Sequence, residues 1–389
     1  MRWIQETLAL LLPSDVETAL LGACLRTGGP ARDEWERWRA AQRADLPLPE
    51  QLSPARALLP LLATSAAAHG LRMDPATRSY LHAGALREDL RARRYRAIAA
   101  EALSALGRGG LTVLVTRGAA LAATVYREPA HRHCHDLDLL VAGPDVAGVA
   151  GALEHIGWKR PHPHDPGRGT RLRHDSGLEA ALHTAAFDVP YYPAPPGDFA
   201  SGGATVAFDG VPARIPSAES TLIHVLGHAA SSSSRRSLRW VTDAWHLLAA
   251  RKDLRWTEVV ARLAAYRLAL PGSVMLTYLV RLGAPVPAGS LASLAQRARG
   301  ADRIEEDVAV AGTYRGTGGD LRRLWRAQRS WRGRMGLARW AVAPSAGYVR
   351  SEFAPRRDWL LPLCYVYRPA RYVAGALAGP PERSSGLRD

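Results

Sequence analysis

Cysteine is scarce in this chain, and long apolar runs are missing. The 389 residues include three cysteines, Cys24, Cys134 and Cys364, which are far apart and odd in number. This pattern predicts reduced thiols and a cytoplasmic protein rather than a disulfide framework. No apolar run approaches about 18 residues without a charge, so we expect no transmembrane helix. Glu6 precedes the short apolar run at residues 8–12, and no small-residue cleavage site follows cleanly, which argues against a signal peptide.

Lysine is nearly absent, so arginine carries almost all of the positive charge. The net charge is +15, with lysine at Lys159 and Lys252 alone. Such an excess fits a polyanionic partner, such as a nucleotide, a nucleic acid or an acidic peptide. A GC-rich genome that spreads arginines over solvated surfaces explains the same composition. Because the arginines lie along several predicted helices and not in one block, the sequence leaves both readings open.

Changes of hydrophobic period divide the chain into four regions, and its length predicts more than one domain. The first and third regions have apolar residues at helix spacing, whereas the second has short strand signals between glycines. The regions are an N-terminal helical region (1–108), an α/β core (109–215), a C-terminal helical domain (216–300) and a helical extension with disordered last residues (301–389). We therefore expect an α+β fold.

Two helical stretches combine arginines with an apolar side. A long helix is predicted over residues 75–106. Its packing side is expected to comprise Leu81, Leu86, Leu90 and Ile98. Near the C-terminus, an arginine-rich amphipathic segment can be read as a membrane-surface helix or as part of the core. We favour core packing for residues 359–361 and expect no membrane partner.

The α/β core begins with a strand, a glycine turn and a helix. Residues 111–115 predict a short buried strand, and residues 119–126 predict a helix, with Gly118 in the turn between them. Backbone N–H groups in such a turn, together with the helix N-terminus, favour a phosphate group.

The next predicted strand, residues 136–141, carries two carboxylates. Alternate side chains of a strand share a face, so Asp136 and Asp138 are expected to point the same way. Two acidic groups side by side repel each other and are not buried unless a cation joins them. Mg²⁺ is commonly held by one or two carboxylates plus substrate phosphates. The pair therefore indicates phosphoryl chemistry on nucleotides.

This order of elements resembles the nucleotidyltransferase superfamily related to DNA polymerase β, and more narrowly an uncharacterised bacterial nucleotidyltransferase family. The motifs that carry the resemblance are Arg117-Gly118-Ala119-Ala120, Tyr126, Arg132, Asp136-Leu137-Asp138-Leu139-Leu140-Val141, Leu222-Ile223-His224 with His228, and Leu238-Arg239-Trp240-Val241-Thr242-Asp243. It covers about residues 50–375. It implies a small mixed-sheet nucleotidyltransferase core flanked by N-terminal and C-terminal helical regions.

The resemblance also implies a reaction. A nucleoside monophosphate would pass from an NTP, with Mg²⁺ or Mn²⁺, to an unknown acceptor, which could be a small molecule, a peptide or a protein. Asp136 and Asp138 would hold the metal and take part in catalysis. The residues expected to bind the nucleotide are Arg117, Gly118, Ala119, Arg132, His183, His224 and His228.

Two positions depart from the family pattern. Arg117 replaces a lysine, which keeps the positive charge but not the compact ammonium. The family's later strand often ends Asp-Leu-His, whereas this chain has Ala181 at the aspartate position, before Leu182 and His183. Glu179 lies two residues before Ala181 and shares the strand face of Ala181 and His183. It is our candidate for the third metal ligand and catalytic carboxylate.

Two other functions stay open beside the transferase. If Glu179 does not replace the missing carboxylate, the chain is a catalytically degenerate protein that binds a nucleotide or a partner without turnover. A nucleic-acid-binding accessory is the third hypothesis. Charge alone motivates it, so nucleic acid is not the favoured partner.

Several basic residues have both a binding and a structural reading. Two sets of histidines have spacings that metal sites also use: His131, His133 and His135 before the aspartate strand, and His224 and His228 on a helix. We favour a polar loop for the first set, and packing or hydrogen bonding to Asp243 for the second, although the second set can also close over a nucleotide. Arg235, Arg236 and Arg239 can grip a triphosphate or belong to a solvated loop.

Overall fold

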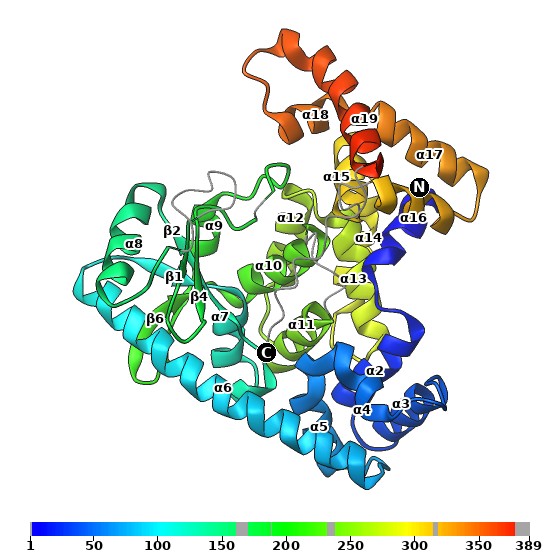
Figure 1. Ribbon diagram of the computed structural model, residues 1–389. Helices are drawn as coiled ribbons and strands as arrows, with labels where there is room; N and C mark the ends of the chain where they lie inside the picture. The colour runs from blue at the N-terminus through cyan, green and yellow to red at the C-terminus, as the bar shows by residue number, and fades with distance from the viewer. Residues whose placement is uncertain (1, 161–169, 188, 232–237, 314–317, 378–389) are drawn as a thin grey trace.

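The computed structural model describes residues 2–160, 170–187, 189–231, 238–313 and 318–377. Helices precede and follow a single six-stranded sheet, which confirms the predicted α+β fold with helical flanks. In Figure 1, the long helix α6 runs beneath the sheet and connects it with the N-terminal helices. The helices before the sheet are α1 (Arg2–Leu8), α2 (Asp15–Leu25), α3 (Gly28–Ala40), α4 (Leu48–Leu52), α5 (Leu59–His69) and α6 (Pro75–Arg108).

Local sequence explains where α2 begins, but not which side of α6 is buried. Ser14 caps α2 through a capping box with Glu17, as expected from its side-chain oxygen. On α6, Leu81 is buried, but Leu86 and Leu90 are 53% and 60% exposed. The prediction that both leucines pack was therefore wrong: α6 turns this part of its surface to solvent, and its buried small residue Gly84 packs against Leu59 instead.

The sheet is mixed and has the strand order β3-β4-β2-β1-β6-β5. The strands are β1 (Val113–Val115), β2 (Asp136–Val141), β3 (Thr170–Arg173), β4 (Glu179–His183), β5 (Ala204–Phe208) and β6 (Val211–Ile215). Antiparallel hairpins β3–β4 and β5–β6 form the two edges, and β2 pairs with β4 in parallel. Two helices complete the region, α7 (Arg117–Thr124) and α8 (Val146–His155), with the short α9 (Pro196–Ala200) before β5.

The two faces of β2 have different roles. Leu137, Leu139 and Val141 belong to the apolar core between the sheet and α6 and α8. Because side chains alternate along a strand, Asp136 and Asp138 lie on the opposite face. The apolar core therefore fixes which way both carboxylates point.

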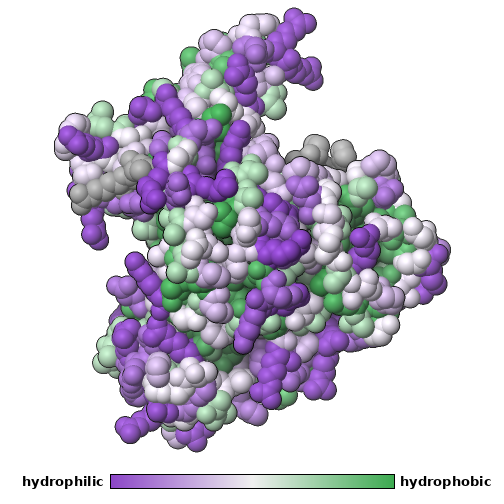
Figure 2. Space-filling model, turned by 180° about the vertical axis from the view of Figure 1, so that it is seen from behind, coloured by the Kyte–Doolittle hydropathy of each residue, from purple (hydrophilic) through white to green (hydrophobic). Residues whose placement is uncertain are grey.

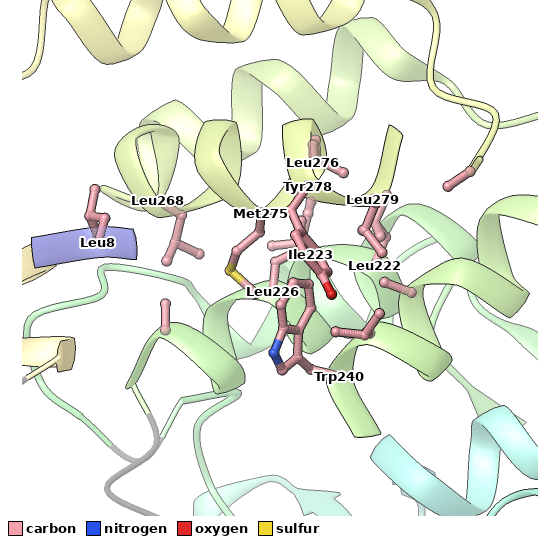
Figure 3. Close-up of a cluster of buried hydrophobic side chains, with 14 of the residues drawn as sticks. Leu8, Leu222, Ile223, Leu226, Trp240, Leu268, Met275, Leu276, Tyr278 and Leu279 are labelled. Atoms are coloured by element: carbon pink, nitrogen blue, oxygen red, sulfur yellow. The ribbon is translucent and has the colours of Figure 1, made fainter. Parts of the chain in front are cut away.

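Helices after the sheet build a second core. They are α10 (Ala218–Ser231), α11 (Arg239–Ala250), α12 (Trp256–Ala265), α13 (Ala269–Arg281), α14 (Ala288–Arg299), α15 (Arg303–Thr313), α16 (Gly318–Ala327), α17 (Trp331–Val342), α18 (Ala346–Phe353) and α19 (Leu361–Leu377). Figure 3 shows Leu222 of α10, Trp240 of α11 and Met275 of α13 packed together, with Leu8 of α1 nearby. The chain's first helix thus closes the C-terminal helical core.

The C-terminal helices differ from expectation in one respect. Trp359 precedes α19 and is 66% exposed, so the prediction that residues 359–361 pack in the core is wrong for this side chain. Among the described residues, no single helix has the length and apolarity to cross a membrane, although the bent pair Trp3–Leu11 and Asp15–Leu25 passes on length and composition.

Candidate functional site

The turn after β1 brings the start of α7 next to β2. The backbone N–H of Thr116 donates to the carbonyl of Asp138 at 2.9 Å. Arg117 then begins α7 with a φ of 54°, in the left-handed region that residues with a Cβ adopt infrequently. Gly118 follows in close contact: a Cβ there would lie 3.2 Å from Cys134 Sγ and 3.3 Å from the Arg132 guanidinium. A side chain at this position would therefore be in tight contact with both neighbours.

Asp138 is the buried centre of the site. Its Oδ1 lies 3.0 Å from Arg117 Nη1 and 2.8 Å from His183 Nε2. Burial alone would raise the pKa of Asp138, but the charge of Arg117 and the hydrogen bond from His183 hold that pKa well below its usual range. The carboxylate is therefore ionised and fixed between two basic side chains.

Asp136 lies nearer to solvent on the same strand face. Its side chain is 25% exposed, and its Oδ2 is 3.6 Å from His135 Nε2. The hydroxyl of Tyr95 on α6 donates to the Asp136 carbonyl at 2.7 Å, which ties the start of β2 to the long helix. Asp136 and Asp138 both line one large cleft.

The register between β2 and β4 shows which residue lies where the family pattern has its third carboxylate. Ala181 is the Cα partner of Asp138 on β2 and of Arg171 on β3, and Glu179 is the partner of Asp136. The Glu179 carboxylate is 3.3 Å from Arg171 Nη1 and 41% exposed. The register therefore places Glu179 beside Asp136 on the same face of the sheet, but its carboxylate pairs with an arginine at the rim.

Arg132 contacts a different carboxylate from those on β2. Its Nε and Nη2 donate to the two oxygens of Asp243 on α11, at 2.7 and 2.9 Å. The Tyr126 hydroxyl donates to the same carboxylate at 2.7 Å. Burial opposes the charge on Arg132, but Asp243 raises the pKa of Arg132, which stays cationic. This buried network joins the sheet region to α11, and Arg132 also lines the cleft.

The two histidines of α10 lie on the other side of Arg117. His224 Nε2 is 3.4 Å from Arg117 Nε, and the His224 ring is edge-on to Phe187 and Phe199. Burial and the charge of Arg117 lower the pKa of His224 far below its usual value, so the ring is neutral. His228 lines the cleft, and its interaction with Asp138 contributes to the lowered pKa of that carboxyl. Of the two predicted roles, packing is therefore confirmed for His224, and the Asp243 oxygens accept from Arg132 and Tyr126.

The three histidines before β2 contact three separate elements. His131 Nε2 is 3.0 Å from Thr64 of α5, and His133 Nδ1 is 3.0 Å from Glu88 of α6. His135 Nδ1 is 3.3 Å from Arg239 of α11. Among the described residues, no group of three metal-ligating side chains is assembled. These contacts support the polar-loop reading.

A cleft of about 2030 Å³ opens beside both aspartates. It lies between the sheet region and the helices on either side of it in sequence. Its basic lining comprises Arg56, Arg87, Arg91, Arg117, Arg132, Arg171 and Arg239, and its acidic lining comprises Glu17, Glu88, Asp136, Asp138 and Asp243. Of the predicted triphosphate grip, Arg239 lines the cleft, whereas Arg235 and Arg236 lie outside the described residues.

Sequence reasoning missed Arg171 and the basic side chains of α6. Arg171 could have been found by counting the β3–β4 hairpin outward from its turn, which sets it opposite Ala181. Arg87 and Arg91 carry no such signal, because only the packing of α6 brings them to the cleft.

Comparison with known families decides the affiliation. A family model described as uncharacterised nucleotidyltransferase matches residues 51–283, more than half of the chain. The chain belongs to this nucleotidyltransferase family. The matched span runs from α4 through α13 and contains the aspartates of β2, Gly118 at the start of α7 and the histidines of α10. Helices α14 to α19 lie beyond it. No curated protein and no solved structure matches the chain.

Proposed function

We propose that this member of the family transfers a nucleoside monophosphate from an NTP to an acceptor, and that it belongs to the polymerase-β-like superfamily. One observation carries the proposal. Asp136 and Asp138 share a strand face at the wall of a large cleft, directly beside the turn at the start of α7. Carboxylates next to a phosphate-favouring helix N-terminus are the arrangement that nucleotidyl transfer needs.

The reaction develops negative charge that cationic side chains can stabilise. The α-phosphate gains charge as the acceptor attacks and pyrophosphate leaves. Arg117 is placed to stabilise that charge, and the backbone of Gly118 and Ala119 at the helix N-terminus is placed to hold phosphate oxygens. His183 fixes the orientation of Asp138, and the neutral His224 packs against Arg117.

A divalent metal fits the donor set in one way. Two carboxylates on one face suit Mg²⁺ or Mn²⁺ that also binds phosphate oxygens. A site made of protein side chains alone would need a third ligand, and the described residues contain no group of three metal-ligating side chains. Asp136 and Asp138 would hold the ion, with Glu179 a ligand only if it leaves Arg171. When bound, the ion would neutralise phosphate charge.

The acceptor has room beside the nucleotide. Sites for single small ligands occupy about 300–1,000 Å³, and the cleft is about 2030 Å³. The space therefore supports a second substrate, whether a small molecule, a peptide or a segment of another protein. Its basic lining favours an acceptor that carries negative charge.

Pyrophosphate release tests the proposal. Each of the four NTPs is incubated with the protein in Mg²⁺, Mn²⁺ or EDTA, with cell extract as the source of acceptor. We expect metal-dependent release with at least one NTP. NTP binding without any pyrophosphate release would instead favour the alternative below.

A specific observation favours a catalytically degenerate binder as the second candidate. Ala181 takes the third carboxylate position, and Asp138 already pairs with Arg117. In that case Ala181→Asp, which adds a carboxylate opposite Asp138, creates turnover that the natural protein lacks. Equal turnover in both proteins excludes this candidate. Tighter Mn²⁺ binding by the variant, seen by electron paramagnetic resonance, checks that the new carboxylate reaches the site.

A further inference from the structure

Exposed apolar side chains are concentrated in the C-terminal helices. Of the thirteen large apolar side chains that are exposed among the described residues, nine lie between residues 325 and 373. Figure 2 shows hydrophobic and hydrophilic side chains next to each other on the lobe that α16 to α19 form. Isolated exposed apolar residues are normal, but a concentration of this kind marks an interaction surface.

On α19 and the turn before it, these side chains form one stripe. Trp359, Leu363, Val366, Tyr367 and Val373 are 58% to 71% exposed. Their spacings of three, four and seven residues place them on one side of a helix. On α17, Trp331, Met335 and Val342 follow the same spacing and are 55% to 70% exposed. We define the five side chains of α19 and the turn before it as the apolar stripe.

The opposite side of α19 is held inside by an arginine. Arg368 is fully buried, and its guanidinium lies 4.4 Å from the Trp340 ring and 3.0 Å from a Glu352 oxygen. It also donates to the Trp340 carbonyl at 2.8 Å. Arg368 lies half a helical turn from the apolar stripe, so these contacts fix the stripe outward and no rearrangement is needed to present it.

The charge around the stripe selects its partner. Residues 329–377 contain nine arginines and two acidic residues, Glu352 and Asp358. Arg332 and Arg334 of α17, and Arg356 and Arg357 before α19, are exposed. A second copy of such a basic surface is repelled, whereas an anionic surface is attracted. Tryptophan and tyrosine beside arginine are the side chains that the headgroup region of a bilayer favours.

We propose that the apolar stripe docks on an anionic phospholipid surface, with α19 lying in the headgroup layer. The earlier expectation of no membrane contact rested on core packing of Trp359, which is exposed. The surface lies beyond the span that the family model matches, so it is independent of the proposed transfer reaction.

Vesicle co-sedimentation of the full chain tests this proposal. Phosphatidylcholine vesicles with phosphatidylglycerol should bind the protein, and vesicles of phosphatidylcholine alone should bind it far more weakly. Replacing Arg356 and Arg357 by glutamine should weaken binding about fivefold per arginine, the equivalent of about 1 kcal/mol each. Val366→Glu, at a position 71% exposed, should abolish binding. Leu90→Glu on α6, at a position 60% exposed, is the matched control and should bind normally.

Two further readouts separate lipid docking from its rivals. Tryptophan fluorescence should shift to shorter wavelength on anionic vesicles, and Trp359→Phe should reduce the shift. Equal binding by the Val366→Glu and Leu90→Glu variants, or equal binding to both kinds of vesicle, overturns the proposal. Sedimentation that reveals a dimer disrupted by Val366→Glu, with no vesicle binding, assigns the stripe to a second copy instead.

Discussion

At the scale of single residues, the acidic side chains of the site differ in the basic side chains that they contact. Asp138 contacts Arg117 and His183, Glu179 contacts Arg171, and Asp243 contacts Arg132. Only the first of these pairs lies at the start of α7. The acids of this site therefore divide into a candidate catalytic carboxylate, a rim carboxylate and one that holds two regions together.

The Arg132–Asp243 pair should contribute strongly to stability. Both side chains are buried, so removing one partner leaves the other charged and poorly solvated. Arg132→Leu should lower the free energy of unfolding by about 3–5 kcal/mol, measured by urea denaturation. Arg39→Leu, which breaks an exposed pair with Glu36, is the matched control and should change it little. Equal losses for the two variants would contradict a structural role for Arg132.

A second residue-level prediction concerns acid stability. Burial lowers the pKa of His246 to about 4, against the opposing charge of Asp243. Between pH about 6.5 and about 4 the unfolded chain binds a proton that the folded chain does not, so stability falls as the pH falls, by up to about 1.4 kcal/mol per pH unit. The buried His224 contributes with the same sign.

Thermal unfolding between pH 7 and pH 4 measures this effect. The midpoint should fall with pH in the natural protein and fall less steeply in His246→Gln. His155→Gln, at the exposed end of α8, should keep the natural slope. An unchanged slope in His246→Gln would show that this histidine does not titrate as described.

At the scale of elements, the strand, turn and helix that carry the site follow from local sequence. The predicted aspartate strand coincides with β2, because burial and turn chemistry act over a few residues. The predicted helix after Gly118 is present as α7, but it begins at Arg117, so Gly118 is its second residue and not part of the turn before it. The outward faces of α6 and α19 were not predictable in this way. A helix that shows apolar residues to solvent has the same local pattern as one that buries them.

Gly118 gives a prediction at this scale. A Cβ at this position would lie 3.2 Å from Cys134 and 3.3 Å from Arg132, so Gly118→Ala should overpack the turn and destabilise the protein by about 1–3 kcal/mol. Gly107→Ala near the end of α6 meets nothing within 4 Å and should stabilise by about 0.5–1 kcal/mol. Denaturant melts of both variants provide the comparison. A stabilised Gly118→Ala variant would show that the first turn of α7 can accommodate the added methyl group.

At the scale of the whole molecule, the cleft draws its walls from segments far apart in the chain. Arg87 of α6, Asp138 of β2 and Arg239 of α11 meet there through tertiary packing. Strand alternation gave the common face of Asp136 and Asp138, and that of Glu179 and Ala181, from sequence. It could not give the pairing of Glu179 with Arg171 or of Arg132 with Asp243. These pairs depend on which oppositely charged side chains tertiary packing brings within reach.

The central claim is that Asp138 supports transfer of a nucleoside monophosphate. The most direct measurement is transfer of label from α-phosphate-labelled NTPs to extract components, with Asp138→Asn as the variant and Asp145→Asn, exposed in the same region, as the matched control. We predict metal-dependent transfer by the natural protein and by Asp145→Asn, and a loss of at least about 100-fold in Asp138→Asn. Full transfer by Asp138→Asn, or transfer that persists in EDTA, would contradict the claim.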